Sequence, residues 1–291
     1  MNSIKKMMLS GALGCLISGM AYADGSSPQP VKPYWQDIQV VAVNKEKPRS
    51  SFMSYADRET ALTSRFEKSP YYSLLNGTWK FFFVDSYKDL PQNITDPSVN
   101  TSSWDDITVP GNWEVQGHGV AIYTNHGYEF KPKNPQPPLL PEANPVGVYR
   151  RDIEIPASWD NRDIYLHIGG AKSGLYVYLN GKEVGYSEDS KNPAEFLINK
   201  YLQPGKNVLT LKIFRWSTGS YLECQDFWRM SGIERDVFLW SQPKASIQDF
   251  RVVSTLDDTY TNGIFKLAVD LKNHTQETKN LNVGYELLDA K

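Results

Sequence analysis

Short apolar runs separated by turn residues dominate the chain from residue 78 onward. Such runs, rich in aromatic and β-branched residues and bounded by Gly, Pro or Asn, are typical of strands. Residues 147–155 are interpreted as alternating between two faces after Tyr149, as expected for a strand with one face in water. The pattern predicts an all-β sandwich of the jelly-roll kind over residues 66–243. Its strands are predicted at 78–84, 107–109, 147–155, 163–168, 207–216 and 235–240.

One connection is predicted in detail, at Asn180-Gly181. Alternating runs at 174–179 and 182–186 flank this dipeptide. Asn-Gly favours a two-residue hairpin, because both central turn positions need positive φ. The only helix that the sequence predicts is a short one within residues 55–62.

Three further strands are predicted after Pro243, at 246–253, 263–271 and 281–288. An immunoglobulin-like sandwich needs roughly 100 residues, so residues 244–291 predict only part of one. Half a sandwich leaves an apolar face and strand edges in water. We therefore expect either a longer gene product or a partner that completes this domain.

The first 23 residues have the features of a secretory signal peptide. Two lysines precede an apolar stretch over residues 7–20, and small residues stand before a predicted cleavage site after Ala23. A periplasmic or secreted location is therefore expected, and no stable membrane span. Lipidation at Cys15 is a less favoured alternative, because the preceding residues make a poor lipobox. Residues 24–65 are predicted to be an N-terminal arm.

Composition narrows the classes of function. The net charge is −2 and no long basic run is present, so nucleic acid is not expected as a partner. The 17 tyrosines, 12 phenylalanines and 8 tryptophans suit an all-β core and also surfaces that bind sugar rings. After cleavage Cys224 would be the single cysteine, which excludes an internal disulfide. The four histidines are scattered and predict no transition-metal site.

Residues 220–232, SYLECQDFWRMSG, carry much polar and aromatic chemistry for a strand connection. Two interpretations are open for Asp226. It could form a bridge with Arg229 that fixes the loop, or it could bind sugar hydroxyls or a hard cation such as Na⁺ or Ca²⁺. A retaining glycosidase holds its two carboxyl groups roughly 5 Å apart, on opposite sides of the scissile bond. Glu223 and Asp226 are three positions apart in one loop and would rarely reach the bond from opposite sides, so they are a poor glycosidase pair.

Asn125, in the segment IYTN, is a second candidate. Its amide can donate and accept hydrogen bonds at once, which suits vicinal sugar hydroxyls. Asparagine in a loop is also a common turn former, so both roles are open at this point.

An ordered set of motifs resembles the N-terminal part of the large β-galactosidases of glycoside hydrolase family 2. The resemblance extends from about residue 35 to residue 243. The motifs are LNGTW at 75–79, VPGNW at 109–113, IYTN at 122–125, NPVG at 144–147, and RWSTGSYLECQDFWRMSGIERDV at 215–237.

The resemblance implies a jelly-roll sugar-binding domain, an immunoglobulin-like domain and a (β/α)₈ barrel with two catalytic glutamates. It implies that Asn125 contacts the galactosyl group, and that Asp226 binds substrate and a Na⁺ that meets the galactose 6-hydroxyl. Mg²⁺ is implied only for the barrel. A barrel takes about 250 residues, so none fits after Pro243 and no catalytic residue is assigned here. Cys224 departs from the pattern, since the best-known member has an acidic residue there.

We therefore expect a non-catalytic part of an enzyme that hydrolyses terminal β-D-galactosides with retention. Its expected partners are the sugar substrate and the missing barrel, with a homo-oligomer left open and no nucleic acid or membrane. A stand-alone carbohydrate-binding module and a family 2 glycosidase with another sugar preference are the alternatives.

Overall fold

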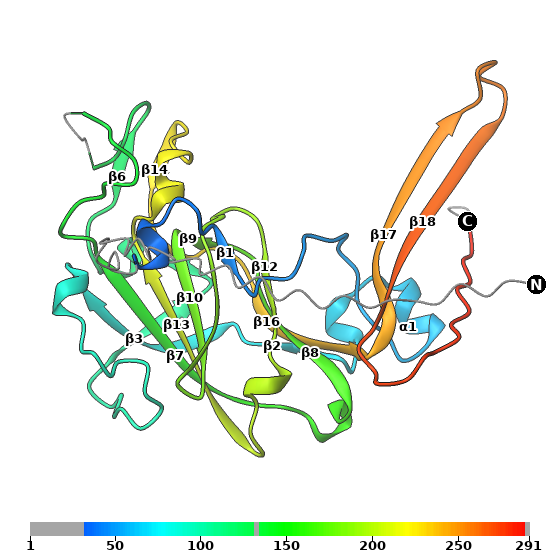
Figure 1. The fold of residues 1–291 in the computed structure, drawn as a ribbon, viewed down its shortest axis with the longest axis horizontal. Coiled ribbons are helices and arrows are strands. Elements are labelled where there is room, and N and C mark those ends of the chain that lie inside the picture. Colours follow the sequence, from blue (N-terminus) through cyan, green and yellow to red (C-terminus); the bar gives the residue numbers. More distant parts are fainter. Residues whose placement is uncertain (1–31, 131–133, 289–291) are drawn as a thin grey trace, which may run out of the picture. The chain divides into compact units, whose positions relative to one another are not determined.

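The structure, a computed structural model, describes residues 32–130 and 134–288 (Figure 1). The predicted signal peptide, its cleavage site and Cys15 lie outside the described residues. Among the helices of the described ranges, none is both long and apolar enough to cross a bilayer.

Two antiparallel sheets form the main body, which confirms the predicted all-β sandwich. The larger sheet has the order β1 (Ala42–Val43), β11 (Lys182–Ser187), β10 (Gly174–Leu179), β13 (Lys206–Phe214), β7 (Val146–Glu154), β3 (Gly77–Val84) and β4 (Asp105–Val109). The smaller sheet has the order β12 (Ala194–Leu197), β8 (Arg162–Ile168), β16 (Val237–Pro243) and β2 (Tyr72–Leu74).

Three small sheets complete the strands. They are β5 (Gly111–Asn112) with β15 (Gly232–Ile233) and β9 (Ala171–Lys172), then β14 (Phe227–Arg229) with β6 (Ile122–Thr124), and β17 (Ala245–Leu256) with β18 (Gly263–Asn273). The helical elements are α1 (Arg58–Leu62) and the 3-10 turns η1 (Tyr34–Gln36), η2 (Phe66–Lys68), η3 (Tyr87–Asp89), η4 (Glu114–Gln116), η5 (Ala157–Trp159), η6 (Asn199–Tyr201) and η7 (Thr218–Tyr221).

The main core lies between the two large sheets. Phe81, Tyr149 and Leu211 from one sheet join Phe196 and Leu239 from the other in a single buried cluster. Fully burying one such side chain stabilises the fold by about 1.5–3 kcal/mol. This core therefore supplies a rigid base for the loops at its edge.

The outer face of the larger sheet is also covered, which the sequence pattern did not indicate. Arg150 is only 5% exposed, so the predicted alternation after Tyr149 is wrong at this position. Its guanidinium lies over the ring of Trp104 and donates to the carbonyls of Ile94 and Val99 in the loop that crosses the sheet. A long side chain with five donors can thus be buried where a polar position would suggest water.

Local turn chemistry is as predicted. Asn180 and Gly181 have φ of 53° and 76°, and they join β10 to β11. The short helix is α1, and the carboxylate of Asp57 caps it by accepting from the backbone N–H of Thr60.

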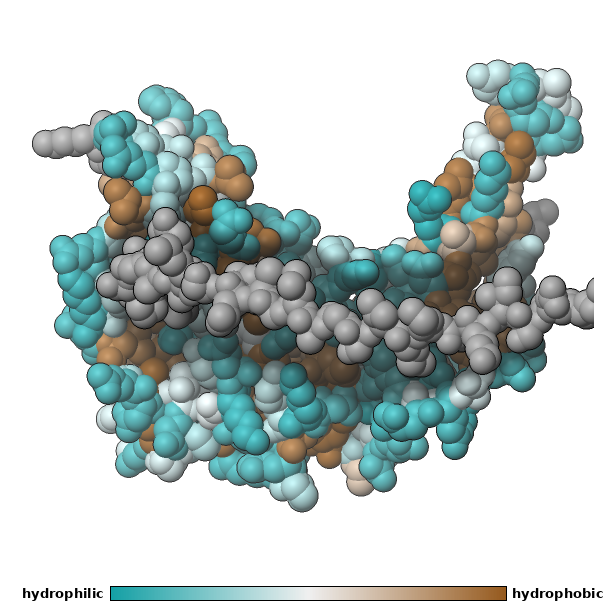
Figure 2. Space-filling model, viewed as in Figure 1, coloured by the Kyte–Doolittle hydropathy of each residue, from teal (hydrophilic) through white to brown (hydrophobic). Residues whose placement is uncertain are grey.

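The predicted third strand at 281–288 is wrong, because residues 274–288 form no strand. Val283 and Tyr285 instead line a cavity of about 370 Å³ with apolar residues of β18, and Tyr285 stacks on Phe265 with ring centroids 5.9 Å apart. Two apolar residues of this run therefore contact the β17–β18 hairpin through their side chains while staying largely exposed, whereas a strand needs backbone partners. Apolar side chains are visible along this hairpin in Figure 2.

Candidate functional site

The two predicted site residues lie at the end of the β6–β14 ribbon (Figure 1). The strands are antiparallel, with Phe227 opposite Thr124 and Trp228 opposite Tyr123. The next pair outward in this register is therefore Asp226 and Asn125. The long-range strand pairing thus brings together the two segments that carry these residues, which are 101 positions apart in the sequence.

The outer face of the ribbon is polar and aromatic. Residues at alternate positions share one face of a strand, which groups Tyr123 with Asn125 and Trp228 with Asp226. All four are exposed, and the rings of Tyr123 and Trp228 are 5.7 Å apart. An aromatic surface beside a carboxylate and a carboxamide can meet both the C–H face and the hydroxyls of a sugar.

Asp226 is held by its neighbour across the ribbon and not by Arg229. The Tyr123 hydroxyl donates to Asp226 Oδ1 at 2.8 Å, and this hydrogen bond raises the pKa of the Tyr123 phenol. Arg229 points the other way, is 1% exposed, and donates to the carbonyl of Glu223 at 2.9 Å. The alternative of an Asp226–Arg229 bridge is therefore wrong, and Asp226 is open to a ligand.

The inner face of the ribbon is anchored by cations around Phe227. The cationic groups of Arg229, Lys191 and Lys172 lie 4.8, 5.3 and 5.5 Å from the centre of its ring. Cation–π contacts gain strength when the cation is desolvated, as Lys172 and Arg229 are. These contacts therefore fix Phe227, the residue directly after Asp226.

Neighbouring residues of the loop have structural roles. Glu223 accepts from the backbone N–H and hydroxyl of Ser190 at 2.9 and 2.6 Å, which ties the loop to the sandwich. Cys224 is half-buried, and burial raises the pKa of its thiol, so the residue has no feature of an activated nucleophile.

The residues at the ribbon end fit a hard monovalent cation in part. Carboxylate and amide oxygens are suitable donors, and Asp226 and Asn125 supply them at the same end of the ribbon. Within residues 32–130 and 134–288, no cluster of three or more His, Cys, Asp or Glu side chains suits a metal ion. A Na⁺ at Asp226 would therefore take its other oxygen ligands from water, sugar or another domain. It would supply a local positive charge that orients a sugar hydroxyl.

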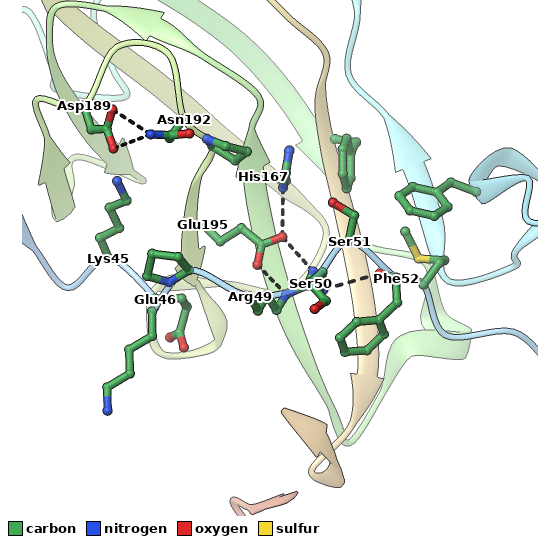
Figure 3. Close-up of a pocket in the computed structure, with 16 residues that line it drawn as sticks. Lys45, Glu46, Arg49, Ser50, Ser51, Phe52, His167, Asp189, Asn192 and Glu195 are labelled. Atoms are coloured by element: carbon green, nitrogen blue, oxygen red, sulfur yellow. Dashed lines mark hydrogen bonds and ion pairs between the residues drawn. The ribbon is translucent and has the colours of Figure 1, made fainter. Parts of the chain in front are cut away.

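A separate cavity of about 340 Å³ lies between residues 45–53 and the smaller sheet (Figure 3). The charged groups on the sheet side are paired, since Glu195 accepts from Arg49, from Trp240 and, at 2.8 Å, from His167. Burial acts to raise the pKa of Glu195, but the His167 hydrogen bond and the Arg49 charge lower it overall. These groups fasten the arm to the sandwich, and the sequence did not predict this arrangement.

Sequence reasoning also missed Tyr123 and Arg215. Tyr123 lies two positions before Asn125, and same-face periodicity along a strand could have placed it beside that residue. Arg215 lies next to Trp216 in one of the motifs, but three of its four partners lie within residues 114–129, far away in the sequence, which no local pattern reveals.

Comparison with known proteins identifies the family. Residues 72–243 match the family described as "Glycosyl hydrolases family 2, sugar binding domain". A β-galactosidase of Priestia megaterium is 39% identical over 89% of this chain and 25% of its own length. One from Psychromonas ingrahamii is 36% identical over 88% of this chain and 24% of its own length. The chain thus spans about a quarter of the length of these curated relatives.

Solved structures agree on the fold. A β-glucuronidase of an uncultured Clostridium species has a TM-score of 0.51 and 21% identity, covering 69% of this chain and 33% of that one. A Bifidobacterium dentium β-glucuronidase has a TM-score of 0.53 and 18% identity, covering 69% and 36%. The chain belongs to glycoside hydrolase family 2, as its motifs indicated.

Proposed function

We propose that this chain is the sugar-binding part of a family 2 β-galactosidase. The observation that supports the proposal is the antiparallel register of β6 and β14, whose continuation by one residue would pair Asn125 with Asp226 at the exposed end of the ribbon. The curated relatives with 36–39% identity are β-galactosidases, which favours galactosides as the substrate class.

In this proposal Asn125 and Asp226 orient the galactosyl group. The Asn125 amide both donates to and accepts from hydroxyls, while the Asp226 carboxylate accepts from a hydroxyl and shares a Na⁺ with it. The Tyr123 hydroxyl bond keeps the carboxylate aimed outward and leaves its second oxygen for the ligand. Both residues hold the substrate in place and transfer no proton.

Bond cleavage is assigned to a barrel outside this chain. Retaining glycosidases use one carboxylic acid to protonate the leaving group and a carboxylate to form the glycosyl-enzyme. Orientation without those two groups gives no turnover, so the 291-residue chain alone is expected to be inactive. Export after cleavage at Ala23 is part of the same proposal.

The test uses the complete gene product that contains this chain, assayed on nitrophenyl galactoside and glucuronide with and without Na⁺. Charge-assisted hydrogen bonds contribute about 1.5–3 kcal/mol, so Asp226→Asn should raise KM for the galactoside at least about tenfold. The Na⁺ dependence of KM should also disappear. Asp106→Asn is the matched control, because Asp106 is an exposed aspartate of β4 paired only with Lys80, and it should change neither quantity.

Three results would contradict the proposal. Asp226→Asn could keep the KM and Na⁺ dependence of the unaltered enzyme. The glucuronide could be the better substrate, which would favour another sugar preference in the same family. Turnover by the purified 291-residue chain would show that the reacting groups lie within it.

A further inference from the structure

Arg215 lies at the base of the ribbon, directly after the central strand β13. Its side chain is 4% exposed. Nη2 donates to the carbonyl of Val120 at 2.9 Å and to the carbonyl of Arg229 at 3.2 Å. Val120 lies two residues before β6 and Arg229 ends β14, so a single guanidinium bonds to the backbone of β14 and of the segment that leads into β6.

Two buried carboxylates face the same guanidinium. Glu114 Oε1 is 3.6 Å from Nη1, and Glu129 Oε2 is 3.8 Å from Nη2. Glu114 stands before β6 and Glu129 after it, and their side chains are 0% and 6% exposed. Glu114 also accepts the backbone N–H of Ser231, just beyond β14. Arg215 thus connects the segments on either side of β6, and the C-terminal end of β14, to the large sheet.

A planar guanidinium is the group that suits this position. Its five donors spread in a fixed fork, so it can reach two carbonyls and two carboxylates in different directions. A lysine ammonium could satisfy only part of this set, and each buried carboxylate left without a cation costs several kcal/mol by the general rule for ion pairs. Lys172, 3.6 Å from Glu129, is the second cation of this cluster.

We propose that Arg215 is a positioning residue for sugar binding, which sets the place of Asn125 and Asp226 through the backbone of the ribbon. Arg215 lies beneath the ribbon and touches no substrate. The inference rests on the proposed function of the ribbon end, but its structural half can be measured without any substrate.

Arg150 is the matched control. It is a buried arginine of the same sheet, 5% exposed, and it also bonds to loop carbonyls, those of Ile94, Asp96 and Val99. Arg150→Lys should cost comparable stability, yet it lies under a different loop. A general loss of stability therefore affects both variants, whereas displacement of the ribbon affects only Arg215→Lys.

The first measurement is amide hydrogen exchange on the 291-residue chain. In Arg215→Lys, protection of the backbone amides of residues 122–124 and 227–229 should fall at least about tenfold relative to Arg150→Lys. Protection in β7 and β13 should be the same in the two variants. The second is steady-state kinetics of the complete gene product. There, Arg215→Lys should raise KM for the galactoside at least about tenfold with kcat within about threefold, and adding Asp226→Asn should raise it little further.

Equal ribbon protection and equal KM in the Arg215 and Arg150 variants would overturn the inference. If Arg215→Lys does not fold, Glu129→Gln replaces it and should shift both readouts in the same direction.

The two proposals can be refuted separately. An Asp226→Asn effect on KM without an Arg215→Lys effect refutes only the positioning role. A loss of ribbon protection with no Asp226→Asn effect on KM refutes only the sugar-binding role.

Discussion

Replacing Arg49 by methionine tests how the N-terminal arm is fastened to the sandwich. The guanidinium donates from Nε and Nη2 to the two carboxylate oxygens of Glu195, each at 2.9 Å, and lies 4.3 Å from the ring centre of Trp240 (Figure 3). Methionine keeps most of the volume but leaves the carboxylate with only His167 and the Trp240 indole as donors.

The magnitude follows from burial and from the remaining partners. Removing one member of a fully buried pair costs about 3–5 kcal/mol. Here the side chains are 12% and 10% exposed and Glu195 keeps two donors, so we expect a loss of about 2–3 kcal/mol in the free energy of unfolding. For a domain of this size that corresponds to a fall of about 5–10 °C in Tm.

The assay is urea unfolding followed by tryptophan fluorescence. Lys80→Met is the control, because the Lys80–Asp106 pair is 2.8 Å long but exposed and should contribute less than about 1 kcal/mol. The double variant Arg49→Met/Glu195→Gln should recover about 1 kcal/mol, since the uncompensated charge is gone. The reasoning is refuted if Arg49→Met costs no more than Lys80→Met, or if the double variant is less stable than Arg49→Met.

Two further predictions concern packing and pH. A Cβ on Gly185 would come within 2.7 Å of the Phe196 ring, so Gly185→Ala should cost about 1–3 kcal/mol, whereas Gly263→Ala, with open space around it, should be nearly neutral by the same unfolding assay. The pKa of Glu195 is lowered in the folded state, so its stabilising effect is complete above its ordinary pKa of about 4.3 and is lost as pH falls through the folded value. The stability advantage over Glu195→Gln should therefore shrink below about pH 4, and a difference that stays constant from pH 6 to pH 3 would contradict this.

Local sequence signals predicted most strands, because the formation of these strands depends mainly on residues close together in the chain. Asn180-Gly181 predicted its hairpin correctly, since the dipeptide itself supplies the positive φ that the turn needs. The same local pattern failed at residues 281–288, where two apolar residues contact the β17–β18 hairpin through their side chains. It failed again at Arg150, whose burial depends on loop residues 56 and 54 positions away in the sequence.

The candidate site lies beyond such local signals. Residue chemistry left Asp226 open between a bridge to Arg229 and ligand binding, and the resemblance to a family selected the second. The pairing of β6 with β14, a long-range property, is what brings together the segments that carry Asn125 and Asp226. The buried set around Arg215 could not be predicted either, since its carboxylate partners Glu114 and Glu129 stand 101 and 86 positions earlier in the sequence.

The shortness of the β6–β14 ribbon has a consequence for redesign. Each strand contributes three residues, and side chains alternate between the wet face and the cationic base. Deleting one residue from either strand would turn Asn125 or Asp226 inward. A deletion in β14 would also move the ring of Phe227 from the inner face to the solvent. Substitutions at the end, by contrast, disturb no core packing. Sugar preference in such a scaffold is therefore best altered by exchange of side chains at constant length.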